Sequence, residues 1–188
     1  MFAGIKFMPT NFILADKKIA MFKYYTVDSN ILMGIVSLIM LIYEYLYIKK
    51  KKFIPKFVFI LKFIGTTTIS LTFITTLVFL TPKLGFYNLY NNSNLFFHLI
   101  VPLLAIISYV FFERYDSKYR ESLLGIVPML IYAVYYISNV FIHYDIKYDF
   151  YGFLNGDFNN AFIAVPIIII VTYLMGLFML FVNKKCNK

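Results

Sequence analysis

The sequence has little of what disulfide, metal or cofactor chemistry requires. Its 188 residues include a single cysteine, Cys186, which excludes an internal disulfide and a cysteine-based metal cluster. There are two histidines, and although His98 and His143 could hold a metal with Asp145 or Asp157, no H-E-x-x-H or comparable spacing is present. The G-x-S-x-G elbow, the P-loop and the glycine-rich dinucleotide turn are missing as well. We therefore expect no metal and no other cofactor.

Charged residues are also scarce, at 14% of the chain against 61% hydrophobic residues, and this composition belongs in lipid. Apolar runs of roughly 20 residues are long enough to cross the hydrocarbon core as helices. They predict an all-α polytopic bundle of about five spans, at residues 26–48, 57–81, 94–112, 122–142 and 160–182. Pro82 is expected to end the second span. Residues 1–25 are predicted to be an interfacial or partly inserted segment, 26–182 a single bundle domain and 183–188 a tail.

Basic residues fall mainly at one end of the predicted bundle. Twelve lie at 49–62, at 113–121 and in the C-terminal tail, against six elsewhere. The positive-inside rule then predicts an outside N-terminus and an inside C-terminus, in the cell membrane. This placement accounts for the net charge of +9 without a nucleic-acid partner. Several tyrosines flank the spans, as in an aromatic belt: Tyr24, Tyr25, Tyr87, Tyr90, Tyr144, Tyr148 and Tyr151.

His98 stands about one turn inside the third span, four residues before Pro102. Proline has no N–H to give to the carbonyl of His98, so helical hydrogen bonding is weakest beside the imidazole. An ionisable side chain inside a span is a functional hypothesis by default. The plainer interpretation is an interfacial histidine that bonds to a neighbouring helix.

In this predicted topology, several polar residues that are not needed to orient the spans lie at the outer interface. They are Thr26, Asp28 and Asn30 at the start of the first span, His98 in the third, Asn139 and His143 at the end of the fourth, and Asp157 before the fifth. A histidine at that depth can act as a general base and a threonine hydroxyl as the nucleophile, for which Thr26 is the candidate. Asp28 or Asp157 could orient the imidazole, as the third member of a triad does.

Three of these residues also have a structural explanation. A threonine just before an apolar run, such as Thr26, is more often a helix cap than a nucleophile. The Asp28 carboxylate suits the positive end of a helix dipole. His143 fits an ordinary exposed loop position.

Three stretches carry a resemblance to a known family: YTVDSNIL at 25–32, NLFFHLIVP at 94–102 and YDFYGFL at 148–154. Their order resembles the pattern of the androgen-induced-gene (FAR-17a-like) membrane proteins and their bacterial relatives, over most of residues 24–182. That family has a threonine in the polar start of a span, a histidine shortly before a proline, and a Tyr–Pro–Phe-type loop. The resemblance implies hydrolysis of lipid esters, with Thr26 as the nucleophile and His98 as its histidine.

The leading hypothesis is therefore a lipid-ester hydrolase or acyltransferase that acts on an acyl ester in the outer leaflet, with membrane lipid as its partner. A small-solute permease, or the membrane substrate-binding subunit of a transporter, is the alternative. Pro102, Pro128 and Pro166 interrupt three spans and fit the broken helices of transport sites. A structural partner without a ligand is the third hypothesis. A Thr26 hydroxyl within about 3 Å of a His98 ring nitrogen would favour covalent chemistry.

Overall fold

The structure, a computed structural model, describes residues 21–143, 148–154 and 157–187. Most of the predicted segment 1–25 lies outside these residues, as do Tyr144 and Asp145. Within the described chain, five stretches of helix are long and apolar enough to cross a membrane: Tyr25–Lys50, Lys56–Leu84, Ser93–Phe112, Tyr119–His143 and Phe158–Cys186. The chain is therefore an all-α, multi-pass membrane protein, as its composition predicts.

Most of these stretches are built from more than one element. The first is α1 (Tyr25–Lys50) alone. The second joins α2 (Lys56–Thr75), the π-helical turn η2 (Thr76–Leu80) and α3 (Thr81–Leu84), and the short α4 (Phe86–Leu89) follows it. The third joins α5 (Ser93–Leu95), the π-helical turn η3 (Phe96–Ile100) and α6 (Val101–Phe112). The last two pair the 3₁₀ turns η4 (Tyr119–Ile126) and η6 (Phe158–Asn160) with α7 (Val127–His143) and α8 (Ala161–Cys186).

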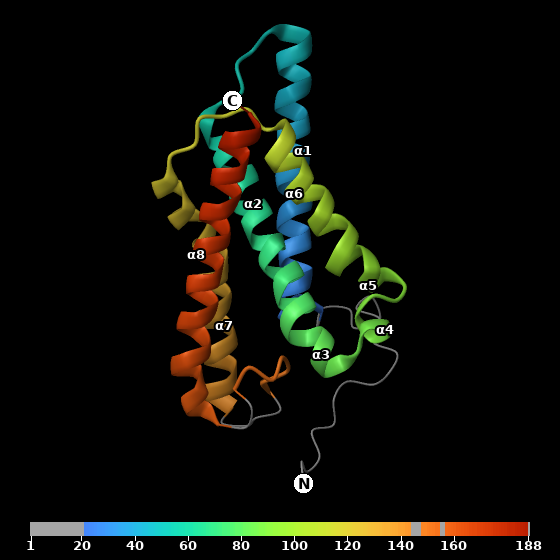
Figure 1. Cartoon of the computed structure of the whole chain (residues 1–188), viewed down its shortest axis with the longest axis vertical. Coiled ribbons are helices and arrows are strands. Elements are labelled where there is room, and N and C mark those ends of the chain that lie inside the picture. The colour runs from blue at the N-terminus through green and yellow to red at the C-terminus, as the bar shows by residue number, and fades with distance from the viewer. Residues whose placement is uncertain (1–20, 144–147, 155–156, 188) are drawn as a thin grey trace.

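The central element is α2, which contacts α1, α6, α7, α8 and η4 and lies between them in Figure 1. It is rich in hydroxyl side chains, and several are buried: Thr66, Thr67, Thr68, Ser70 and Thr72. In apolar surroundings each hydroxyl needs a partner, and three of these donate to the carbonyl four residues earlier on the same helix. Their small size lets neighbours approach, and a Cβ on Gly125 of η4 would lie only 2.9 Å from Cγ2 of Thr67.

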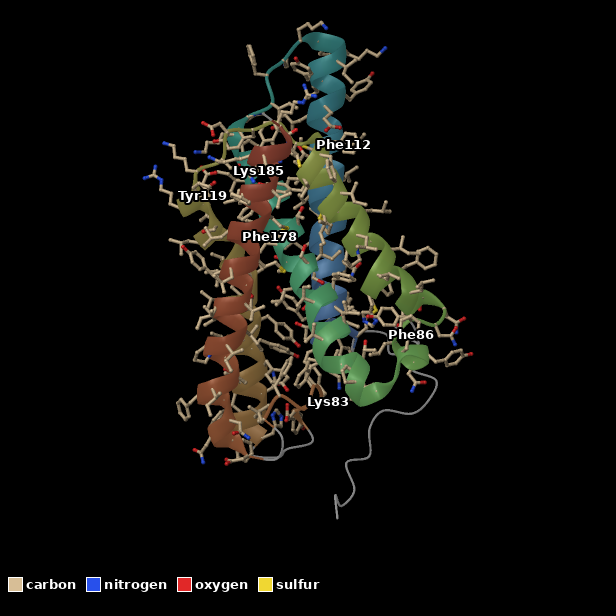
Figure 2. All side chains as sticks on the ribbon, in the orientation of Figure 1. Lys83, Phe86, Phe112, Tyr119, Phe178 and Lys185 are labelled. Carbon is tan, nitrogen blue, oxygen red and sulfur yellow. The ribbon has the colours of Figure 1, made fainter. Side chains whose placement is uncertain are left out.

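The outer surface of the bundle carries large apolar side chains. Phe112 and Phe178 stand on this surface in Figure 2, and they are 74% and 65% exposed. Leu41, Ile131 and Phe162, from α1, α7 and α8, are similarly exposed. A soluble protein would not leave so much apolar area in water, whereas lipid is its natural surrounding.

The two ends of the bundle differ in character. The C-terminus lies with residues 49–56 and 113–118 at one end, which we call the basic end, and Figure 2 labels Lys185 there. We call the opposite end the tyrosine end; it holds α3, α4 and the loop 148–154, with Lys83 and Phe86 labelled. The segments that the positive-inside rule assigns to the cytoplasm thus share one end of the bundle. That this end faces the cytoplasm stays a prediction.

Asparagine side chains of the α8 C-terminal region fasten the basic end. The Nδ2 group of Asn183 donates to the carbonyls of Tyr109 at 2.7 Å and Glu113 at 2.9 Å, and that of Asn187 donates to Val110 at 2.9 Å. These bonds satisfy carbonyls at the C-terminus of α6 that have no partner within the helix. Beside them the buried Lys62 ammonium faces the Glu113 carboxylate at 3.7 Å.

Pro82 does not end the second span, contrary to the sequence expectation. The helix continues to Leu84 and stops at Gly85, whose φ of 83° is the left-handed region that favours glycine. A π-helical turn instead comes just before Pro82, and another comes just before Pro102. In each case the proline stands two residues after the turn, because its missing N–H and its ring disturb the regular ladder on its N-terminal side. Such π-helical turns are frequent at functional sites.

Candidate functional site

The loop 148–154 folds back into the tyrosine end and is organised by Asp149. Its carboxylate accepts the backbone N–H groups of Phe153 and Leu154, each at 2.9 Å, and the hydroxyl proton of Tyr136 from α7. The loop therefore inserts Tyr151 and Leu154 into the bundle, where they are 8% and 1% exposed. Asp149 is an acidic residue in a polar loop, and the sequence does not indicate that it bonds to Tyr136 on α7.

Beneath this loop lies a cavity of about 60 Å³ between α1, α2, α7 and α8, which we call the tyrosine cavity. Most of its wall is apolar, with side chains such as Leu71, Met129 and Val165. Its polar groups are hydroxyls, from Thr26, Thr72, Thr75, Thr76, Tyr25, Tyr132, Tyr136 and Tyr151. The space suits an uncharged polar group together with a few methylenes better than it suits an ion.

Thr26, the predicted nucleophile, is buried and belongs to the wall of this cavity. The Tyr151 side chain comes close to both Thr26 and Tyr132. Its hydroxyl oxygen is buried without a hydrogen-bond partner of normal geometry. Burial raises the pKa of Tyr151 to about 12, so the hydroxyl keeps its proton and remains a donor.

His98, the predicted base, is buried in η3 at the same end of the molecule. Its Nδ1–H donates to the backbone carbonyl of Leu89 at 2.7 Å, and the ring of Tyr90 stands edge-on to it. A carbonyl oxygen can only accept, so Nδ1 carries the proton and Nε2 carries the lone pair of the neutral ring. This is the tautomer that a general base acting through Nε2 needs. The orienting partner is a backbone carbonyl, and neither Asp28 nor Asp157 takes the role predicted for them.

Asn30 is the link between the segments that carry Thr26 and His98. Its Nδ2 group donates to the carbonyl of Thr26 at 2.7 Å and to the carbonyl of Phe97 at 3.2 Å. The two side chains themselves are not joined: no hydrogen bond of the described chain connects Thr26 with His98, and His98 is not part of the cavity wall. The structure thus brings the backbones of the pair together without forming a dyad.

The other predicted site residues lie apart from this pair. Asn139 donates to the Tyr135 carbonyl of its own helix, and His143 Nδ1–H donates to the Asn139 carbonyl and stacks on Tyr148. Asp157 accepts the backbone N–H of Asn159 and so caps η6. These bonds are all local. His143 is exposed, as the sequence predicts, but it is the last residue of α7 and not a loop position. Asp28 lines a separate groove between α1 and α7.

The aromatic-belt interpretation is wrong for several tyrosines. Tyr24, Tyr90 and Tyr151 are buried in a core cluster at this end, whereas Tyr87 is 76% exposed and fits a belt.

The loop 148–154 also departs from the Tyr–Pro–Phe pattern that the sequence resemblance implies. Gly152 has a φ of 69°, which proline cannot adopt, and its N–H donates to the Asp149 carbonyl.

Among the described residues, no three or more histidine, cysteine, aspartate or glutamate side chains come together in a group that could hold a metal ion. The tyrosine cavity instead presents hydroxyl donors to whatever enters it.

Comparisons with known proteins identified no relative: the chain matches no protein-family model, no curated protein and no solved structure.

Proposed function

We propose that this protein binds a membrane-lipid ester in the tyrosine cavity and hydrolyses it, with the cell membrane as its location. The buried hydroxyl of Tyr151, which has no hydrogen bond of normal geometry although the side chains of Thr26 and Tyr132 lie close to it, carries the proposal. A buried donor without a partner is costly, and an ester carbonyl, which can only accept, would satisfy it. The apolar part of the wall would hold the first methylenes of the acyl chain, while the rest of the chain stays in lipid.

In the proposed reaction the Thr26 hydroxyl attacks the ester carbonyl carbon, and Nε2 of His98 takes the threonine proton. The Tyr151 hydroxyl donates to the oxyanion that develops on the carbonyl oxygen. The carbon–oxygen bond to the alcohol then breaks, His98 returns the proton to the leaving alcohol, and an acyl-threonine remains. Water activated in the same way releases the fatty acid. Thr26 and His98 share no hydrogen bond in this structure, so the step requires them to approach each other when the ester binds. Catalytic groups are often further apart in the absence of substrate than in its presence.

A permease for a small polar solute is supported less well by the same residues. The cavity is small and most of its wall is apolar, which favours an amphiphile over a hydrated solute. The π-helical turns before Pro82 and Pro102 are the features that suit a transporter, because they loosen two spans at the same end.

The test is turnover of methyl dodecanoate by the purified full-length protein in mild detergent, measured as released dodecanoate. We expect the Thr26→Ala variant to be inactive and the Tyr151→Phe variant to lose about a hundredfold, the usual effect of removing one oxyanion donor. Thr75→Ala is the matched control, since Thr75 also lines the cavity but lies on α2. Activity in Thr26→Ala equal to that in Thr75→Ala would refute the mechanism. A fluorophosphonate probe should label Thr26 in the wild-type protein.

A further inference from the structure

A second concave site lies beside the tyrosine cavity, in the groove of about 460 Å³ between α1 and α7. Thr68 of α2 contributes to its wall, and its side chains include the Asp28 carboxylate and the rings of Tyr25, Tyr132 and Tyr135. Tyr25 and Tyr132 line both sites, and their rings stand 5.0 Å apart, edge to face. These two tyrosines therefore form the wall that separates the groove from the cavity.

Asp28 is the charged residue of this groove, because its wall contains no lysine or arginine. In the described chain the Asp28 carboxylate has no hydrogen bond and no ion pair, although the side chain is half-buried. The hydroxyl oxygen of Tyr25 is buried and has no hydrogen bond of normal geometry, although the Thr68 side chain lies close to it. An unpaired carboxylate at membrane depth is expensive, and a cationic ligand would offset that cost.

The aromatic rings of this end already hold ammonium groups of the chain itself. The Lys83 ammonium lies 3.8 Å from the centre of the Phe79 ring, and that of Lys23 lies 5.1 Å from the centre of the Tyr24 ring. A carboxylate surrounded by tyrosine rings is the arrangement that recognises organic ammonium ions, through charge pairing and cation–π attraction. The Asp28 groove offers this arrangement without a lysine of its own.

We propose that this groove binds the ammonium headgroup of a membrane amphiphile. The ammonium would lie between the Asp28 carboxylate and the rings of Tyr25 and Tyr135. An amphiphile suits the site better than a free amine because the groove continues over apolar side chains. Leu32 lies one turn further along α1, and Ile131 on the rim is 67% exposed towards the lipid side of α7. The site is distinct from the tyrosine cavity, so it can be tested separately from the proposed hydrolysis.

The experiment is isothermal titration of the purified full-length protein in nonionic detergent with dodecylammonium, and with dodecanol as the neutral probe of equal chain length. The wild-type protein should bind dodecylammonium at least about tenfold more tightly than dodecanol, which is the scale of a cation–π contact combined with a charge pair. Asp28→Asn should abolish this preference and leave the affinity for dodecanol within about twofold. Tyr135→Leu should reduce the preference about threefold to tenfold.

Asp157→Asn is the matched control, because it removes the same charge from an exposed residue at the same end of the bundle. It should keep the full preference for dodecylammonium. A preference that survives in Asp28→Asn, or that falls equally in both variants, would overturn the proposal, as would ethylammonium that binds as tightly as dodecylammonium. If the ammonium preference is absent while methyl dodecanoate is still hydrolysed, the groove proposal fails and the proposed function stands. The reverse result would leave the groove proposal intact and refute the hydrolysis.

Discussion

The imidazole of His98 is fixed by the backbone carbonyl of Leu89, which accepts its Nδ1–H at 2.7 Å. Leu89 belongs to the short α4, so this bond ties the connection after the second span to the third span. The histidine therefore has a structural role in the molecule whatever chemistry its other nitrogen performs. The two roles use different ring nitrogens, and substitutions can separate them.

Replacing His98 by asparagine should preserve the fold and remove the base, because the asparagine amide places a donor near the position of Nδ1 and nothing at that of Nε2. We expect the free energy of unfolding to fall by less than about 1 kcal/mol in His98→Asn and by about 1–3 kcal/mol in His98→Ala, which leaves the Leu89 carbonyl unpartnered. The measurement is helicity during titration with sodium dodecyl sulfate. Hydrolysis of methyl dodecanoate should fall at least about a hundredfold in both variants. A fully active and stable His98→Asn would show that the residue is structural only.

The fold of this protein was predictable because the spans depend on apolar length alone. Each run of roughly 20 apolar residues became a membrane helix, because a backbone in lipid can satisfy its polar groups only internally. The ends of the helices were less predictable. A π-helical turn just before Pro82 accommodates the proline, and the helix continues to Leu84. It ends there because Gly85 adopts the left-handed conformation.

The candidate site was predictable only in its individual residues. The sequence singles out Thr26 and His98 as polar groups near one membrane face, but contacts with other elements decide where their side chains lie: the Leu89 carbonyl of α4 accepts from His98, and Tyr151 of the loop lies close to Thr26. The sequence predicts Tyr151 to be an interfacial anchor, because a tyrosine near a helix end has the same pattern whether it faces lipid headgroups or the core. Asp149 turns the loop inwards through its bond to Tyr136, and no local sequence pattern predicts that contact.

Asp149 should be the residue on which the loop over the cavity most depends. Its carboxylate accepts three donors, and Asp149→Asn replaces one acceptor oxygen with a donor that faces them. We expect a loss of about 1–3 kcal/mol in the free energy of unfolding and faster cleavage of the loop by added protease. Asp157→Asn should lose less than about 1 kcal/mol, since its exposed carboxylate accepts a single N–H. Equal losses in the two variants would contradict the assigned role.

Gly152 should tolerate no other residue well, and proline least of all. Its φ of 69° costs an alanine about 1 kcal/mol, and proline would also remove the N–H that donates to the Asp149 carbonyl at 2.9 Å. Gly34 is the control, because it lies inside α1 with no atom within 4 Å of an added Cβ, and Gly34→Ala should stabilise the helix by about 0.5–1 kcal/mol. The comparison uses the same titration with sodium dodecyl sulfate. A Gly152→Pro variant as stable as the wild type would show that this chain can form the Tyr–Pro–Phe turn that the sequence resemblance implies.

Glu113 at the basic end should make the stability of the protein depend on pH. Burial raises the pKa of this carboxyl to about 7, although the Lys62 ammonium acts in the opposite direction. The folded protein therefore binds the proton at a pH where the unfolded chain, with its ordinary pKa of about 4.5, has released it. The contribution of Glu113 to the free energy of unfolding is consequently largest below pH 4.5 and is lost as the pH rises through about 7.

We expect the wild-type protein to gain about 1–2 kcal/mol from this residue when the pH falls from 8 to 5.5, measured by unfolding titrations at both values. The Glu113→Gln variant should lose this dependence because glutamine cannot titrate. Asp116→Asn is the control, since the Asp116 carboxylate is 96% exposed and lies three residues away in the same segment. It should keep the wild-type dependence. If Glu113→Gln and the wild type change equally between the two pH values, the pH dependence arises elsewhere and Glu113 does not titrate in this range.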